Sequence, residues 1–144
     1  MAAKHKFSGA HVVISTNLTG DEAARIAKSV GEGTKGDIRI GLNHVRFEGA
    51  QQGRLNFSIR ALKDVMEFMT FHVDITPSAT GSQIRSSIDG FKTKQQKLFM
   101  LIPIAPKRML AYKTYSLFMR NLEQAFAAAD ASAQTSITER VAAR

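Results

Sequence analysis

An unbroken apolar run over residues 98–105, followed by a long amphipathic pattern, constrains the fold of this chain more than any other feature. From Tyr112 to Phe126, large apolar residues recur at steps of three and four, which predicts a helix with one buried face. Pro103 cannot donate a ladder hydrogen bond, so the run should be a strand that ends, or lies at a sheet edge, by that residue. We therefore expect a sheet closed by a C-terminal helix.

The N-terminal part predicts a strand over residues 7–15 and then a helix. Thr19 stands three residues before Glu22, which is the spacing of a capping box, so the helix should begin there. A narrow apolar stripe follows, and Gly31 is a suitable stop.

The central part changes from helical to alternating periodicity. Strands are expected over residues 38–47, 55–60, 65–75 and 83–91, the first of them with a kink near Asn43 and His44. The connections are too short for parallel crossovers, so the strands should form an antiparallel meander. The predicted class is α+β, with a curved antiparallel sheet of about six strands gripping a long C-terminal helix.

Length and composition indicate one domain over residues 1–129 of the 144. The remainder, residues 130–144, is rich in Ala, Ser and Thr and is expected to extend the helix or to fray. No apolar stretch approaches the roughly 18–20 residues of a transmembrane helix, and the N-terminus does not look like a secretory signal. With no cysteine in the chain, a cytoplasmic location is expected.

The order of elements resembles the helix-grip superfamily, also called START-like, polyketide cyclase-like or SRPBCC. The resemblance covers roughly residues 7–126: the opening strand, the helix capped by Thr19, the meander, and the entry through residues 102–106 into the tyrosine-bearing helix. It implies a sheet that grips the last helix around a cavity for lipids, polyketides, hormones or other apolar molecules. The first helix and the loop at residues 31–36 are short for families that carry a lid there. Because the superfamily includes enzymes and binding proteins, membership does not by itself give a function.

Three glycines, Gly31, Gly33 and Gly36, have the spacing of the dinucleotide-binding fingerprint. That motif works between a strand and the N-terminus of a helix. Here a predicted helix precedes the glycines and a predicted strand follows them, so we interpret the segment as a loop.

No catalytic residue is predicted. The chain has no Gly-x-Ser-x-Gly elbow, and its four histidines lack the spacing and the accompanying cysteines of a metal site. Glu48, Glu67 and Asp74 are expected to form solvated pairs with arginines on the outer face of the sheet. We therefore predict no metal and no cofactor, and we expect a binding protein rather than an enzyme.

The leading hypothesis is noncatalytic binding of a small hydrophobic or amphipathic ligand between the sheet and the C-terminal helix. Arg60, His72 or a tyrosine hydroxyl, from Tyr112 or Tyr115, would orient the polar end of that ligand. The apolar wall is predicted from Leu55, Phe57, Ile59, Phe71, Val73, Met100, Tyr115 and Met119. A cyclase-like or aromatase-like enzyme is the third hypothesis.

The second hypothesis rests on charge. The chain carries a net charge of +8, and no acidic residue occurs between Asp89 and Glu123. Such a surface attracts an acidic partner protein, an anionic membrane or nucleic acid. Nucleic acid is the least favoured partner, because the nearby aromatic residues fit the apolar face of the sheet or helix. The predicted basic patch consists of Lys92, Lys94, Lys97, Lys107, Arg108 and Lys113.

Overall fold

The computed structural model describes residues 7–36, 43–61, 66–94, 97–98, 102–103 and 108–139. For residues 94, 97–98, 102–103 and 108 it describes the backbone alone. Neither helix in this part of the chain is long and apolar enough to cross a membrane.

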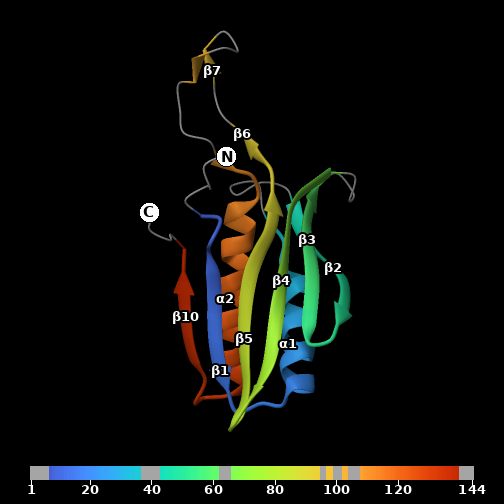
Figure 1. Cartoon of the computed structure of the whole chain (residues 1–144), viewed down its shortest axis with the longest axis vertical. Helices are drawn as coiled ribbons and strands as arrows, with labels where there is room; N and C mark the ends of the chain where they lie inside the picture. Colours follow the sequence, from blue (N-terminus) through green and yellow to red (C-terminus); the bar gives the residue numbers. More distant parts are fainter. Residues whose placement is uncertain are drawn as a thin grey trace.

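The centre of the molecule is a six-stranded sheet in the order β10-β1-β5-β4-β3-β2, in which every pairing is antiparallel (Figure 1). The α+β class and the antiparallel meander are thus confirmed. The strands are β1 (His11–Thr16), β2 (Asn43–Gln51), β3 (Arg54–Ala61), β4 (Met66–Ser78), β5 (Gly81–Phe91) and β10 (Gln134–Thr138).

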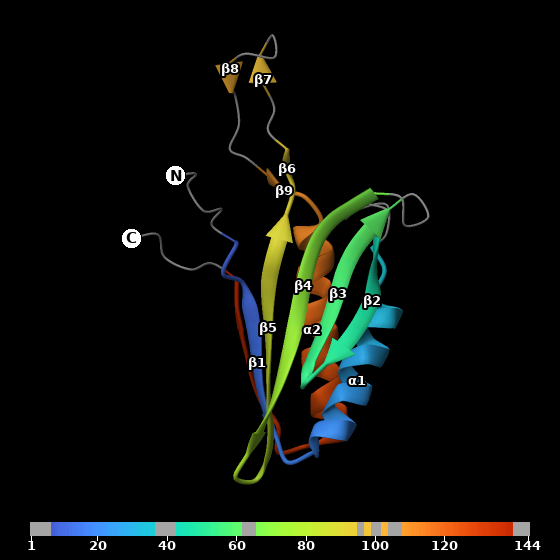
Figure 2. The same ribbon diagram turned by 45° about the vertical axis from the view of Figure 1, so that its right-hand side comes forward.

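Two helices, α1 (Gly20–Gly33) and α2 (Tyr112–Ala129), lie on the same face of this sheet (Figure 2). We call this the helix side and the opposite face the open face. α1 begins as predicted: the Thr19 hydroxyl accepts the Glu22 N–H at 3.2 Å and donates to the Glu22 carboxylate at 3.1 Å. α2 follows Ala111, whose backbone is left-handed with φ 66°, and no side chain caps it.

The described residues of the apolar run, Leu98, Ile102 and Pro103, lie outside the main sheet, although the sequence predicted a sheet strand here. These residues pair with one another, since β7 (Lys97–Leu98) lies antiparallel to β8 (Ile102–Pro103). A second ribbon joins β6 (Thr93–Lys94) to β9 (Arg108–Met109), and both ribbons extend past the end of the sheet (Figure 2). Between β5 and α2 the described chain therefore pairs with itself and adds no strand to the six-stranded sheet.

The expected kink in the second strand lies further along than predicted. Asn43 and His44 pair regularly with β3, and the register shifts between Phe47 and Gly49 instead. Gly49 has φ 142°, a value that side-chain-bearing residues rarely adopt, so glycine places the irregularity there. The first part of the predicted strand, residues 38–42, lies outside the described residues.

The tail prediction is wrong for residues 130–139. The chain turns at Asp130 and returns along β1 as β10, so these residues belong to the same domain as the sheet. Asp130 fixes the turn because its carboxylate accepts the Thr16 hydroxyl at 2.7 Å, the Asn17 N–H at 2.9 Å and the Ser132 hydroxyl at 2.6 Å. Residues 140–144 lie outside the described part of the chain.

The Asp130 turn predicts an acid-sensitive contribution to stability. Hydrogen bonds from Ser132, Asn17 and Thr16 hold the pKa of Asp130 well below its usual range. A carboxylate with a lowered native pKa stabilises the fold above its ordinary pKa of about 3.9 and loses that effect as pH falls towards the native value. We expect Asp130→Asn to be less stable than the natural chain in urea unfolding at neutral pH, and this difference to narrow progressively as pH falls from about 4 towards the native pKa of Asp130. A gap that does not change with pH would contradict this assignment.

A groove beneath the first helix

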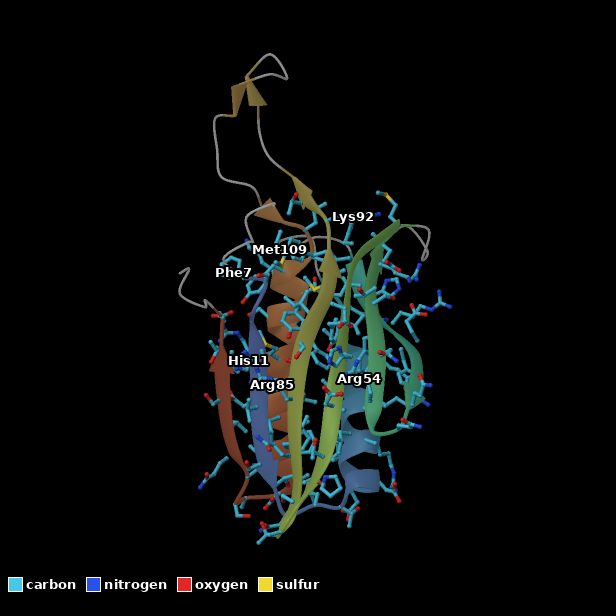
Figure 3. The ribbon with its side chains drawn as sticks, viewed as in Figure 1. Phe7, His11, Arg54, Arg85, Lys92 and Met109 are labelled. Carbon is cyan, nitrogen blue, oxygen red and sulfur yellow. The ribbon has the colours of Figure 1, made fainter. Side chains whose placement is uncertain are left out.

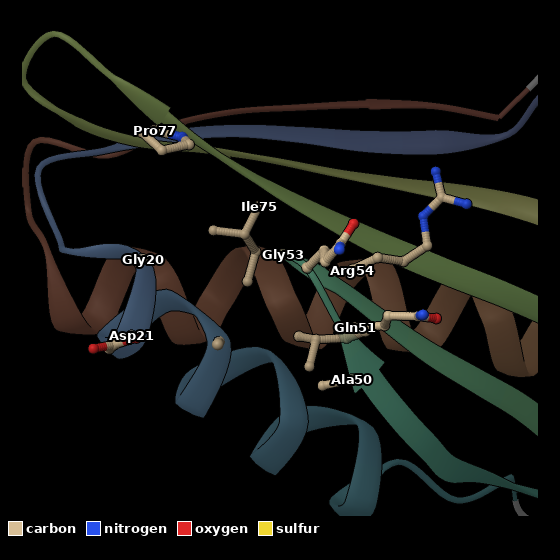
Figure 4. A pocket seen from close by; sticks show the side chains of 11 residues that line it. Gly20, Asp21, Ala50, Gln51, Gly53, Arg54, Ile75 and Pro77 are labelled. Atoms are coloured by element: carbon tan, nitrogen blue, oxygen red, sulfur yellow. The ribbon is translucent and has the colours of Figure 1, made fainter.

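An open groove of about 320 Å³ lies between the N-terminal half of α1, the β2–β3 turn and β4 (Figure 4). Its apolar surface comes from Ala24, Leu55 and Ile75, which face the helix side of the sheet. The complete lining is Gly20, Asp21, Ala24, Ala50, Gln51, Gln52, Gly53, Arg54, Leu55, Ile75 and Pro77.

Small residues at the end of α1 keep this groove open. A Cβ at Gly20 would lie 3.9 Å from Cγ2 of Ile75, so glycine leaves space where a larger residue would fill it. Ala24 is one helical turn further on and is also small. On the opposite wall, Gly53 has φ 80° and forms the tight β2–β3 turn together with Gln52, at φ 49°. The hydrophobic pattern of the sequence does not predict that these residues line a groove. The one relevant feature is that Gly20 and Ala24, both small, are four residues apart and so lie on the same side of a helix.

The predicted apolar wall forms the packed centre of the protein. The Phe71 ring lies 5.2 Å from Phe57, 5.0 Å from Tyr115 and 4.8 Å from Phe118, measured between ring centroids. Interdigitated rings of this kind fill the space between sheet and α2 in the way that protein cores are filled. The buried members of the predicted wall are Leu55, Phe57, Ile59, Phe71, Val73, Tyr115 and Met119. Met100 lies outside the described residues, and Leu55 alone also borders the groove.

The Tyr115 hydroxyl takes part in a complete buried network. It donates to the Ala10 carbonyl at 2.9 Å and lies 2.8 Å from the Ser86 hydroxyl, which in turn accepts the Val12 N–H at 3.0 Å. Burial raises the pKa of Tyr115 well above its ordinary value. The hydroxyl therefore joins α2 to β1 and β5.

Tyr112 joins the two ends of the described chain. Its hydroxyl donates to the Glu139 carboxylate at 3.0 Å, and its ring stacks on Phe7 with the centroids 4.1 Å apart. Burial, followed by the hydrogen bond to Glu139, raises the pKa of Tyr112 well above its ordinary value. Neither tyrosine is a lining residue of the groove.

Arg60 lies on the open face, on the far side of the sheet from the neighbouring buried Ile59. Its guanidinium donates to Glu67 at 2.8 Å and to Glu48 at 3.1 Å, and the Ser58 hydroxyl also donates to Glu48. Burial opposes the shift, but the hydrogen bonds from Ser58 and Arg60 lower the pKa of Glu48. The solvated acid–arginine pairs predicted for this face are therefore present.

His72 is also on the open face, because it alternates with Phe71 and Val73 along β4. Its Nδ1 lies 2.7 Å from Asp89 and its Nε2 lies 3.2 Å from Asp74. These neighbours leave the residue 8% exposed. Arg60 and His72 are thus separated from the apolar residues with which they were grouped.

Charge continues along the open face beyond His72. Arg54 donates to Asp74 at 2.9 Å, a contact that raises the pKa of Arg54. Figure 3 shows this face, with Arg54 and Arg85 labelled. Within the described residues, no group of three or more His, Asp or Glu side chains has an arrangement that would hold a metal ion.

Two members of the predicted basic patch have described side chains, and both are exposed: Lys92, which follows β5, and Lys113, in the first turn of α2. Lys92 lies at the end of the molecule where β6 and β9 pair (Figure 3). The side chains of Lys94, Lys97 and Arg108, and all of Lys107, lie outside the described part.

No family model, no curated protein and no solved structure matches this chain.

Proposed function

We propose that this protein binds a small amphipathic molecule, without chemical conversion, in the groove beneath α1. The observation that carries the proposal is the 320 Å³ space with an apolar surface at Leu55, Ile75 and Ala24. Ligand sites are typically about 300–1,000 Å³, mostly apolar, with a few polar groups that fix orientation. The groove lies at the small end of that range, which favours a compact ligand.

The distribution of polarity favours an amphipathic ligand over a fully apolar one. Ile75 and Leu55 would cover an apolar end, while Asp21 and Gln51 border the groove and offer polar groups to the other end. Because the groove opens to solvent, a polar end can stay hydrated while the apolar end is buried.

Membership of the helix-grip superfamily is part of the same proposal. The antiparallel sheet with a long helix on one face supports it. The strand β10, which follows that helix and pairs with β1, is an addition to the element order on which the resemblance rests. In this proposal the ligand lies beside α1, and the residues that face α2 serve as core.

Filling the groove should weaken ligand binding. Ala24→Leu replaces a methyl group by an isobutyl group in the groove, whereas Ala128→Leu makes the same change at an exposed position of α2. Alanine and leucine both favour helices, so the two variants change helix propensity by a similar small amount. With a medium-chain fatty acid or an isoprenoid alcohol at about 100 times its Kd, the natural chain and Ala128→Leu should gain about 2.7 kcal/mol of stability, seen as a raised unfolding midpoint. Ala24→Leu should bind at least about tenfold more weakly.

Two results would count against the proposal. One is that neither class of ligand raises the midpoint of the natural chain. The other is that Ala24→Leu and Ala128→Leu respond alike, which would place any bound ligand elsewhere.

A further inference from the structure

We infer that β10 is an association edge, on which a second copy of this chain adds its own β10 in antiparallel orientation. The two six-stranded sheets would then form one continuous sheet across a twofold axis. β10 is the end of the strand order and pairs with β1 on one side. On its other side the described part of the chain places no strand, and Figure 1 shows β10 as the outermost strand.

The opposite edge of the sheet, formed by β2, is protected against pairing with another strand. The Val45 N–H of β2 donates to the Thr34 carbonyl at 3.0 Å, and the Gly36 N–H donates to the Asn43 carbonyl at 2.6 Å, so the chain after α1 covers the beginning of this edge. Further along, β2 has the irregularity before Gly49 and two charged residues. Bulges, charges and covering segments are the usual protections of an exposed edge against pairing.

In the part of the chain that the structure describes, β10 has no bulge, no charged residue and no strand on its outer side. Its sequence, Gln-Thr-Ser-Ile-Thr, contains no charge, proline or glycine, and its register with β1 is regular. Three of its five residues are β-branched, which suits a paired strand. An edge of this composition is suited to main-chain pairing with another strand.

The identity of the partner follows from self-complementarity. If the twofold axis passes through Ile137, that residue meets its own counterpart on the helix side, where it already packs on the core and remains partly exposed. Ser136 then lies opposite Thr138 of the other copy, and Thr135 lies opposite Glu139. No like charges face each other along this pairing.

The charged residues of α2 are compatible with the same twofold axis. Arg120 contacts Glu139 at 3.4 Å, and Glu123 accepts the Thr135 hydroxyl at 2.7 Å. Since Thr135 of one copy lies opposite Glu139 of the other, Glu123 of each copy is brought towards Arg120 of the other. The twofold axis therefore places Glu123 of each copy beside the Arg120–Glu139 ion pair of the other, where Arg120 offers it an opposite charge.

The test uses charge exchange between copies. Arg120→Glu gives a chain with two acidic residues at positions 120 and 123, and Glu123→Arg gives a chain with two basic ones. Sedimentation equilibrium should show the natural chain dimerising and each variant alone dimerising at least about tenfold more weakly. An equimolar mixture of the two variants should recover the dimer, because each acidic position then faces a basic one. Recovery also shows that both variants are folded.

A cross-link checks the strand pairing itself. The chain has no cysteine, so Ile137→Cys introduces a single thiol at the proposed axis, where paired Cβ atoms are close enough for a disulfide. Mild oxidation should give a covalent dimer, whereas Val13→Cys on the neighbouring interior strand should not. A natural chain that stays monomeric at about 1 mM, single variants that dimerise like the natural chain, or equal cross-linking at both positions would overturn the inference.

Discussion

Phe71→Ala should lower the free energy of unfolding by about 3–5 kcal/mol, the usual range for removing a buried phenylalanine ring. Phe71 has no exposed surface, and its ring contacts the rings of Phe57, Tyr115 and Phe118. Truncation therefore removes contacts between the sheet and α2 and leaves a cavity between them. Urea unfolding followed by circular dichroism measures the effect.

Phe47→Ala is the matched control for this prediction. Phe47 also packs on Phe57, with centroids 5.6 Å apart, but it is partly exposed near the edge of the sheet, where Lys28 lies over its ring. Solvent already reaches this position, so the same substitution should cost markedly less than at Phe71. Equal losses at the two positions would mean that the space under α2 is not packed as described.

Gly31→Ala should destabilise the protein by about 1–3 kcal/mol, although alanine is normally the better helix residue. A Cβ at Gly31 would lie 2.3 Å from Cε1 of Phe57, far inside van der Waals contact. The Phe57 ring cannot easily move away, because it is buried and stacked on Phe71. The substitution therefore forces α1 away from the sheet.

Gly33→Ala, two residues further along the same helix, should have the opposite sign. No atom lies within 4 Å of a Cβ at Gly33, so the replacement gains helix propensity without a clash and should stabilise by up to about 1 kcal/mol. The two variants differ in local packing and hardly at all in chemistry. Stabilisation by both would show that α1 does not approach Phe57 as closely as the structure indicates.

Local patterns predicted the elements that depend on local chemistry. The spacing of Thr19 and Glu22 located the start of α1, and the alternation of Leu55, Phe57 and Ile59 located β3 and its buried side. Both patterns involve residues within a few positions of each other. No knowledge of the distant chain was needed to interpret them.

The local pattern also predicts that His72 and Arg60 lie away from the apolar wall, because neighbouring residues of a strand face opposite sides of the sheet. His72 stands between two buried residues of β4, and Arg60 follows Ile59. The alternation therefore places both side chains on the face opposite the apolar wall. The groove is different in kind, because Gly20, Ala50 and Ile75 come from three separate segments that meet only in the folded protein.

Hydrophobic periodicity alone specifies the layers of this protein, because apolar periods of two and of about 3.6 residues require a sheet with one dry face and helices that cover it. Which segments lie beside each other depends instead on contacts between distant parts of the folded chain. The uncharged stretch at Gln134–Thr138 could pair with any strand edge, and the Asp130 turn directed it to β1. Strand pairing is main-chain hydrogen bonding that carries little sequence information, so the choice of partner depends on the fold as a whole.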